Sequence, residues 1–219
     1  MKILAIGDIH GENHWKKIIK KYEDQVDKVI WLGDYIDSFF VNGKNQIDNL
    51  KEILEYKKNN WDKVDLLWGN HDLQYLGSSR CSGYQVNFAF EIEELFKTHL
   101  DYFQICSVYS NWLFSHAGFT EIYCHCQEHK ITDPLQCNEI CKDKNYKFFN
   151  FVGPQIHGDN LNEGPLWCRP RALLLNPLPN YHQVVGHTEG DKIWSTKVKG
   201  LEYHFIDVYS HDGFLMIEV

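Results

Sequence analysis

The chain has 219 residues, of which 43% are apolar and 24% are charged, and its formal net charge is −8. This composition is ordinary for a soluble globular protein with a substantial core. An acidic chain argues against nucleic acid as the main partner, because such binding depends on clustered Lys and Arg. No apolar run approaches the roughly 20 residues that span a bilayer, and we expect neither a signal peptide nor a membrane partner.

The first half of the chain is expected to alternate between strands and helices. Apolar runs at residues 2–6, 28–32 and 64–68 predict strands, and apolar residues at helical spacing predict helices over 13–24 and 46–59. This alternation favours parallel strands joined by helical crossovers. A third helix is predicted over residues 86–99.

The second half is expected to be richer in strands. Residues 103–108 and 112–114 predict a hairpin, and further strands are predicted at 183–185, 192–196, 203–208 and 214–219. Residues 119–165 are the least regular and predict short helices and loops. The pattern indicates a single α/β domain over residues 1–219, with a mixed sheet or two packed sheets flanked by helices.

Five short segments follow the predicted strands, and each places Asp, Asn or His beside glycine. They are Gly7-Asp8-Ile9-His10-Gly11, Gly33-Asp34-Tyr35-Ile36-Asp37, Gly69-Asn70-His71-Asp72, Ser115-His116-Ala117-Gly118 and Gly186-His187-Thr188. One such segment alone means little. Five in order at strand ends predict a two-metal site that hydrolyses phosphate esters.

The residue types in these segments suit two divalent cations. Asp8 and His10 point to the same side if the segment is extended, so both can reach one cation. Asp34 has two oxygens and can bridge two cations about 3.5–4 Å apart. Three neutral ligands remain, which are Asn70, His116 and His187. A mixed oxygen and nitrogen set favours Mn²⁺, with Fe or Zn as alternatives, over Ca²⁺.

His71 directly follows Asn70 and cannot easily face the same cation. It is better placed to protonate the leaving alcohol as a general acid. Such a histidine needs a carboxylate partner. Asp37 and Asp72 are both candidates, and Asp37 is preferred because it lies just beyond Asp34.

These segments resemble those of the calcineurin-like metallophosphoesterases, and most closely the phosphoprotein phosphatase branch. The resemblance covers residues 2–118, then 165–188 and the final strands. It implies a four-layer α/β/β/α sandwich with two mixed sheets. It implies Asp8, His10 and Asp34 as ligands of one metal, and Asp34, Asn70, His116 and His187 as ligands of the other. It also implies His71 as the general acid, Asp37 as its partner, and Asn70 as a contact of the substrate phosphate.

The arginines are where the chain departs from that family. An Arg expected after Asp37 is replaced by Ser38, and the chain has three arginines in all. Arg169 lies in a Leu-Trp-x-Arg segment that resembles a phosphate-binding segment of related bacterial and viral enzymes. Arg80 and Arg171 are candidates to replace the missing guanidinium, which Lys or Ser replaces poorly. Otherwise the reacting phosphate carries less charge, as in a diester.

Seven cysteines are an odd number, and the default expectation is reduced thiols in the cytoplasm. Cys124, Cys126, Cys137 and Cys141, with His129 nearby, leave open a structural zinc site. The alternative is that these thiols are reduced and partly buried.

The sequence therefore predicts a metal-dependent phosphoesterase, foremost a protein Ser/Thr phosphatase acting through metal-activated hydroxide. A hydrolase of dinucleoside polyphosphates or a nucleotide phosphodiesterase is the main alternative. A catalytically dead binding module of the same fold is a remote one, because drift would be expected to remove at least one ligand.

Overall fold

Two five-stranded sheets form the centre of the protein in the computed structural model, which describes residues 1–126, 130–155 and 159–219. The first has the order β10-β1-β2-β3-β4, and the second has the order β5-β6-β7-β9-β8. The strands are β1 (Lys2–Ile6), β2 (Lys28–Trp31), β3 (Val64–Leu67), β4 (Phe103–Gln104), β5 (Cys106–Tyr109), β6 (Trp112–Ser115), β7 (His182–Val185), β8 (Trp194–Val198), β9 (Leu201–Phe205) and β10 (Phe214–Glu218).

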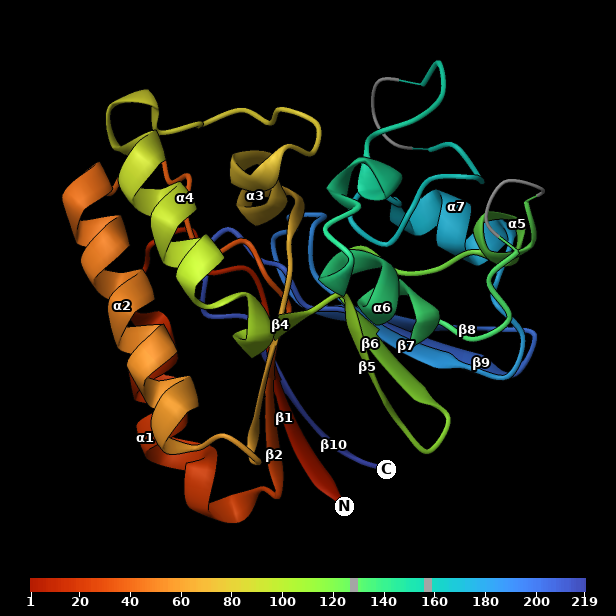
Figure 1. Ribbon diagram of the computed structural model, residues 1–219. Helices are drawn as coiled ribbons and strands as arrows, with labels where there is room; N and C mark the ends of the chain where they lie inside the picture. The colour runs from red at the N-terminus through yellow and green to blue at the C-terminus, as the bar shows by residue number, and fades with distance from the viewer. Residues whose placement is uncertain (127–129, 156–158) are drawn as a thin grey trace.

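Helices cover the outer faces of both sheets (Figure 1). The α-helices are α1 (His14–Tyr22), α2 (Gly43–Asn59), α3 (Asn70–Leu73), α4 (Ala89–Thr98), α5 (Glu121–His125), α6 (Gln136–Lys142) and α7 (Pro170–Leu175). The short 3-10 turns are η1 (Glu23–Gln25), η2 (Gln74–Leu76), η3 (Val86–Phe88), η4 (Leu100–Tyr102) and η5 (Tyr146–Phe149). Helices α1, α2 and α4 lie beside the first sheet, whereas α5, α6 and α7 lie beside the second. The predicted four-layer α/β/β/α sandwich is confirmed.

Strand β1 shows why these layers form. Leu4 and Ile6 belong to the core under helices α1 and α2, whereas Ile3 and Ala5 belong to the core between the two sheets. Both faces of the strand are therefore buried, which explains a continuous apolar run in place of an alternating one. Pairing is parallel with β2 and antiparallel with β10, so both chain ends lie together at one end of the sheet.

The predicted strand at residues 103–108 is wrong as a single element. Residues 103–104 pair with β3 in the first sheet, and residues 106–109 pair with β6 in the second. The chain passes between the sheets at Ile105, whose backbone N–H donates to the side chain of Asn138 on α6 (2.8 Å). An apolar run shows that a segment is buried, but it does not show which sheet the segment joins.

The other predicted helices and strands are present with ends shifted by a few residues. The irregular character of residues 119–165 is confirmed for its described part, which holds α5, α6 and η5. Helix α7 was not predicted, although Pro170 at its first position is a typical start signal. Within the described ranges, no helix is both long and apolar enough to cross a membrane.

Candidate metal centre

The five glycine-flanked segments meet at one end of the two sheets. Asp8 follows β1, Asp34 follows β2, Asn70 begins α3 after β3, His116 follows β6 and His187 follows β7. A cleft of about 660 Å³ opens over them, and His116 is buried beneath it. Residues up to 179 positions apart in sequence are thereby brought into direct contact, as between Asp8 and His187.

Asp34 lies at the centre of this group. Its Oδ1 accepts a hydrogen bond from the backbone N–H of His71 (2.9 Å). Its Oδ2 faces the Nε2 of His10 at 3.7 Å and the Nε2 of His116 at 3.4 Å. The carboxylate therefore stands between two groups of candidate ligands, as a bridging ligand must.

Three candidate ligand atoms converge on the second position. The Nε2 of His116 lies 2.7 Å from the Oδ1 of Asn70, and the Nδ1 of His187 lies 3.1 Å from both. The Nδ1 of His116 donates to the carbonyl oxygen of Leu32 (2.8 Å), so its Nε2 presents a lone pair. The amide nitrogen of Asn70 faces the sulfur of Cys81, so its oxygen faces the histidines.

This arrangement fits a cation. Two lone pairs that face each other at 2.7 Å repel, unless a positive charge lies between them. Asp8, Asp34 and His116 also each offer one ligand atom within 4.8 Å of the others. The donor set of carboxylate oxygen, amide oxygen and imidazole nitrogen matches Mn, Fe or Zn.

His10 reaches the centre by a route other than the predicted one. The segment is not extended at this residue, because its φ of +41° lies in the left-handed region. The turn, and not strand alternation, aims the imidazole toward Asp34. Its Nδ1 donates to the carbonyl oxygen of Ile36 (2.8 Å), which leaves Nε2 as the free nitrogen.

Backbone strain is concentrated at these residues. Four residues of the candidate site have a positive φ although they are not glycine: His10, Asp34, Asp37 and His187. Each such position costs on the order of 1 kcal/mol or more and persists only where the surroundings enforce it. Strain of this kind is common where side chains are held for function.

The crowding of buried carboxylates at this site also indicates that the site holds a cation. Burial, followed by the charges of Asp207 and Asp34, raises the pKa of Asp8 well above its usual range. Burial, Glu189 and Asp34 raise the pKa of Asp207 to about 7. A bound cation would remove this repulsion, since opposite charge favours the ionised form.

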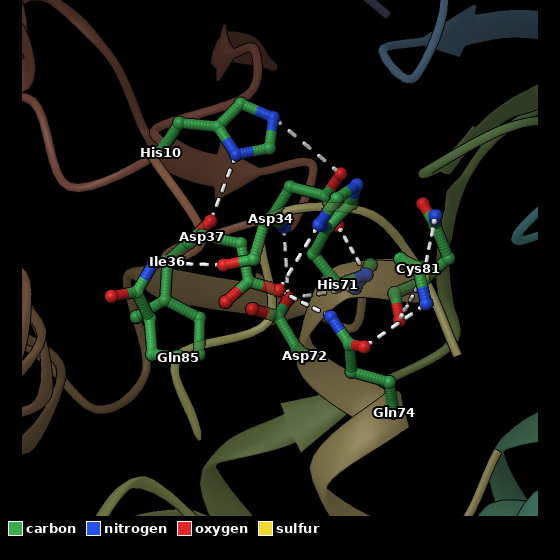
Figure 2. A network of polar contacts seen from close by, with 12 residues as sticks. His10, Asp34, Ile36, Asp37, His71, Asp72, Gln74, Cys81 and Gln85 are labelled. Atoms are coloured by element: carbon green, nitrogen blue, oxygen red, sulfur yellow. Dashed lines mark hydrogen bonds and ion pairs between the residues drawn. The ribbon is translucent and has the colours of Figure 1, made fainter. Parts of the chain in front are cut away.

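The structure pairs His71 with Asp37. The Nδ1 of His71 lies 3.1 Å from the Oδ2 of Asp37, and Figure 2 shows both side chains beside Asp34. Burial lowers the pKa of His71, but the charge of Asp34 and the hydrogen bond to Asp37 outweigh it and raise the pKa to about 9. The imidazole is thus equipped to hold a proton at neutral pH.

Asp72, the other candidate partner, has a different task. It accepts hydrogen bonds from the backbone N–H groups of Asp34 (2.8 Å), Tyr35 (2.9 Å) and Gly69 (2.9 Å). These bonds hold the loops after β2 and β3 together. The preference for Asp37 over Asp72 therefore agrees with the geometry.

Two residues that sequence reasoning missed hold Asp37 in place. The hydroxyl of Tyr75 donates to its Oδ1 (2.6 Å), and the amide nitrogen of Gln74 donates to its Oδ2. Both follow His71 within one helical turn, and that spacing is a signal that could have indicated them. Cys81 also lines the cleft, beside Asn70.

The three arginines differ in whether they line the cleft. Arg169 lines the cleft and donates to the carbonyl oxygen of His187 (3.1 Å) and to the hydroxyl of Thr188 (3.2 Å). Arg80 also lines the cleft, and its guanidinium lies 3.9 Å from the ring centre of Tyr84. Arg171 is exposed on α7 and is not among the residues that line the cleft, so the structure does not bring it together with the other two.

The structure does not gather the cysteines of the predicted zinc site. Across the described ranges, no three of Cys124, Cys126, Cys137 and Cys141 bring their sulfurs within 4.8 Å of one another. Cys137 and Cys141 instead belong to the buried core on α6, and His129 lies outside the described residues. A preformed four-thiolate site is therefore not supported.

Comparison with solved structures identifies the fold. A cold-active protein-tyrosine phosphatase of a psychrophilic Shewanella species is similar with a TM-score of 0.62 and 17% identity, over 99% of this chain and 75% of that one. A metallophosphoesterase from Sphaerobacter thermophilus has a TM-score of 0.52 and 14% identity, over 100% of this chain and 89% of that one. No curated protein matches the chain in sequence.

The family model that matches the chain, together with candidate ligands that converge at the ends of its strands, defines the class of protein: it is a metal-dependent phosphoesterase. The family model for calcineurin-like phosphoesterases matches residues 1–188, and the chain belongs to that family. Divalent metal ions at the cleft are therefore expected of the functional protein.

Gly69→Ala tests whether backbone packing sets the position of Asp34. A Cβ at residue 69 would lie 2.0 Å from the Oδ1 of Asp34, so the carboxylate must move. We expect phosphoesterase activity to fall about tenfold to a hundredfold, as for a group that orients a metal ligand. Gly190→Ala is the matched control, because its nearest neighbour would lie 3.6 Å away. Equal activities of the two variants would contradict this account.

Proposed function

We propose that this phosphoesterase is a protein serine/threonine phosphatase that works with two divalent metal ions, Mn²⁺ in the native form. Asp8, His10 and Asp34 would hold one ion, and Asp34, Asn70, His116 and His187 would hold the other. The ions would neutralise the phosphoryl oxygens and activate the attacking water. The odd number of cysteines supports a cytoplasmic location.

The pair of His71 and Asp37 is the observation that supports this substrate class best. An alkyl alcohol is a poor leaving group and needs a proton as the ester bond breaks, whereas an activated phenol does not. Asp37 is buried and holds the Nδ1–H of His71, which leaves Nε2–H to donate to the leaving serine or threonine oxygen. A general acid whose partner carboxylate is held in this way suits alkyl esters, because their leaving oxygen needs a proton.

Two arginines would bind the phosphate before and during the reaction. Arg169 is anchored at the loop that carries His187. The guanidinium of Arg80 lies over the ring of Tyr84, which in turn stacks on Tyr75 with ring centres 4.5 Å apart. A guanidinium that already has contacts beside the cleft loses less freedom when it binds a phosphoryl oxygen than an unattached one. Arg80 is therefore the candidate for the role that Ser38 cannot fill.

A comparison of Arg80→Ala with Arg171→Ala tests this assignment. Loss of a charge-assisted hydrogen bond costs about 1.5–3 kcal/mol, so kcat/KM for a phosphomonoester should fall by roughly tenfold to a hundredfold in Arg80→Ala. Arg171→Ala should retain the wild-type value, because its side chain is exposed away from the cleft. An equal loss in both variants, or none in Arg80→Ala, would contradict the role given to Arg80.

Ser38 favours a second candidate, a hydrolase of phosphodiesters or dinucleoside polyphosphates. If Arg80 does not reach the phosphate, the cleft has one guanidinium from Arg169, which suits a reacting phosphate of lower charge. The two candidates differ in substrate and not in fold or metals.

A panel of substrates separates the candidates. Wild-type protein loaded with Mn²⁺ is assayed on one peptide that carries phosphoserine, the same peptide with phosphotyrosine, diadenosine tetraphosphate and a bis-aryl diester. We expect the highest kcat/KM for the phosphoserine peptide. A higher value for the diester or the dinucleotide would favour the second candidate, and a higher value for phosphotyrosine would change the amino acid that is dephosphorylated. The solved phosphatase of the Shewanella species, described as a protein-tyrosine phosphatase, makes that last arm worth including.

A further inference from the structure

Two consecutive phenylalanines stand exposed at the cleft. Phe39 is 73% exposed and Phe40 is 91% exposed, and both line the same cleft as the candidate metal ligands. Large apolar side chains next to each other on a surface mark contact sites when they adjoin a functional cleft. They directly follow Ser38, the position at which the family resemblance leads us to expect an arginine.

The loop that carries these residues is firmly held. The hydroxyl of Ser38 accepts hydrogen bonds from the backbone N–H groups of Phe40 and Val41, both at 3.1 Å. The buried side chain of Gln46 accepts from the N–H of Ser38 (3.0 Å) and donates to the carbonyl oxygens of Ser38 (3.2 Å) and Val41 (2.6 Å). Serine at position 38 thus shapes the loop from within, and the two rings are presented on a fixed backbone.

The position of the loop decides which part of a substrate it meets. Asp37 immediately precedes it and holds His71, the group that would donate a proton to the leaving oxygen. The leaving group must depart on the side of its proton donor. Phe39, Phe40 and His71 line the same cleft, so a substrate whose leaving oxygen meets His71 can extend over the two rings, while the arginines and candidate metal ligands serve the phosphoryl group.

We propose that Phe39 and Phe40 bind an apolar side chain next to the phosphorylated residue of a protein substrate, and so select phosphorylation sites with an apolar neighbour. This rests on the proposed protein phosphatase activity. A polypeptide is the occupant because the alkyl leaving group that the pair of His71 and Asp37 suits, a serine or threonine, continues into a polypeptide chain. An extended chain can lay an apolar side chain across the exposed pair.

The test compares two phosphoserine peptides that differ in the flanking residues, Leu or Phe in one and Ser in the other, with β-glycerophosphate as a small ester. Because the apolar side chain would be removed from water against the two rings, wild-type kcat/KM should favour the apolar peptide by roughly tenfold. The double variant Phe39→Ser/Phe40→Ser should bring this ratio close to one. Phe90→Ser is the matched control, because Phe90 is 77% exposed on α4 and is not among the residues that line the cleft.

Each outcome bears on the proposal. A wild-type ratio near one overturns it, and so does an unchanged ratio in the double variant or an equal drop in Phe90→Ser. If β-glycerophosphate is hydrolysed but neither peptide is, the protein phosphatase activity fails and this proposal fails with it. Hydrolysis of both peptides at equal rates overturns the role of Phe39 and Phe40 alone. Circular dichroism of the double variant establishes that its fold is intact before the rates are compared.

Discussion

Asp34→Asn is expected to abolish phosphoester hydrolysis while the protein stays folded. The side chain faces both halves of the candidate centre, at 3.7 Å from His10 and 3.4 Å from His116. An amide in its place keeps Oδ1 as the acceptor for the N–H of His71, but it turns an NH₂ group toward the candidate ligands. The amide NH₂ group would repel a cation, whereas the carboxylate oxygen attracts it.

The expected loss of kcat/KM is roughly a thousandfold, well above the tenfold to hundredfold typical of groups that only orient a ligand. Asp48→Asn is the matched control, since Asp48 is exposed on α2. Activity on p-nitrophenyl phosphate and metal content should be measured on the same preparations. A variant at position 34 that keeps its metals and its rate would refute the bridging role.

His71→Ala is expected to separate substrates by their leaving groups. General acid catalysis contributes about 10²–10⁴-fold where the leaving oxygen needs a proton. An alkyl ester such as β-glycerophosphate or a phosphoserine peptide should therefore lose about that factor. An activated aryl ester such as p-nitrophenyl phosphate should lose far less, because its phenolate leaves without protonation.

Asp37→Asn extends this prediction to the partner of His71. An amide can still contact Nδ1, but it removes the negative charge that helps to raise the pKa of His71 to about 9. The imidazolium would then lose its proton at a lower pH. The alkaline limb of the pH–rate profile for an alkyl ester should move to lower pH, with little change for the aryl ester. Equal losses on both esters in His71→Ala would end the general-acid assignment.

Much of the site could be predicted from sequence because its chemistry is local. Strand β1 is an apolar run that ends at Ile6, and Gly7 and Asp8 follow at once. The same order holds for Asp34 after β2 and for His187 after β7. Parallel strands bring their carboxyl ends to one edge, so the order of motifs along the chain implies that they meet in space.

Features that depend on the tertiary path could not be predicted in this way. The break at Ile105 depends on Asn138, which lies 33 positions further on. The turn at His10 depends on its backbone bond to Asp34, the orientation of its ring depends on Ile36, and the position of Arg171 depends on the unpredicted helix α7. Phe39 and Phe40 read as ordinary apolar residues, because sequence does not reveal which apolar side chains remain outside the core.

The central claim is that two divalent ions share Asp34, and metal analysis of the purified protein tests it most directly. Protein loaded with Mn²⁺ and freed of excess metal should contain about two ions per chain, with an electron paramagnetic resonance signal of coupled Mn²⁺. Asp34→Asn should lose that coupling together with activity. A fully active protein that holds one ion or none, or that keeps its rate after chelation, would contradict the account.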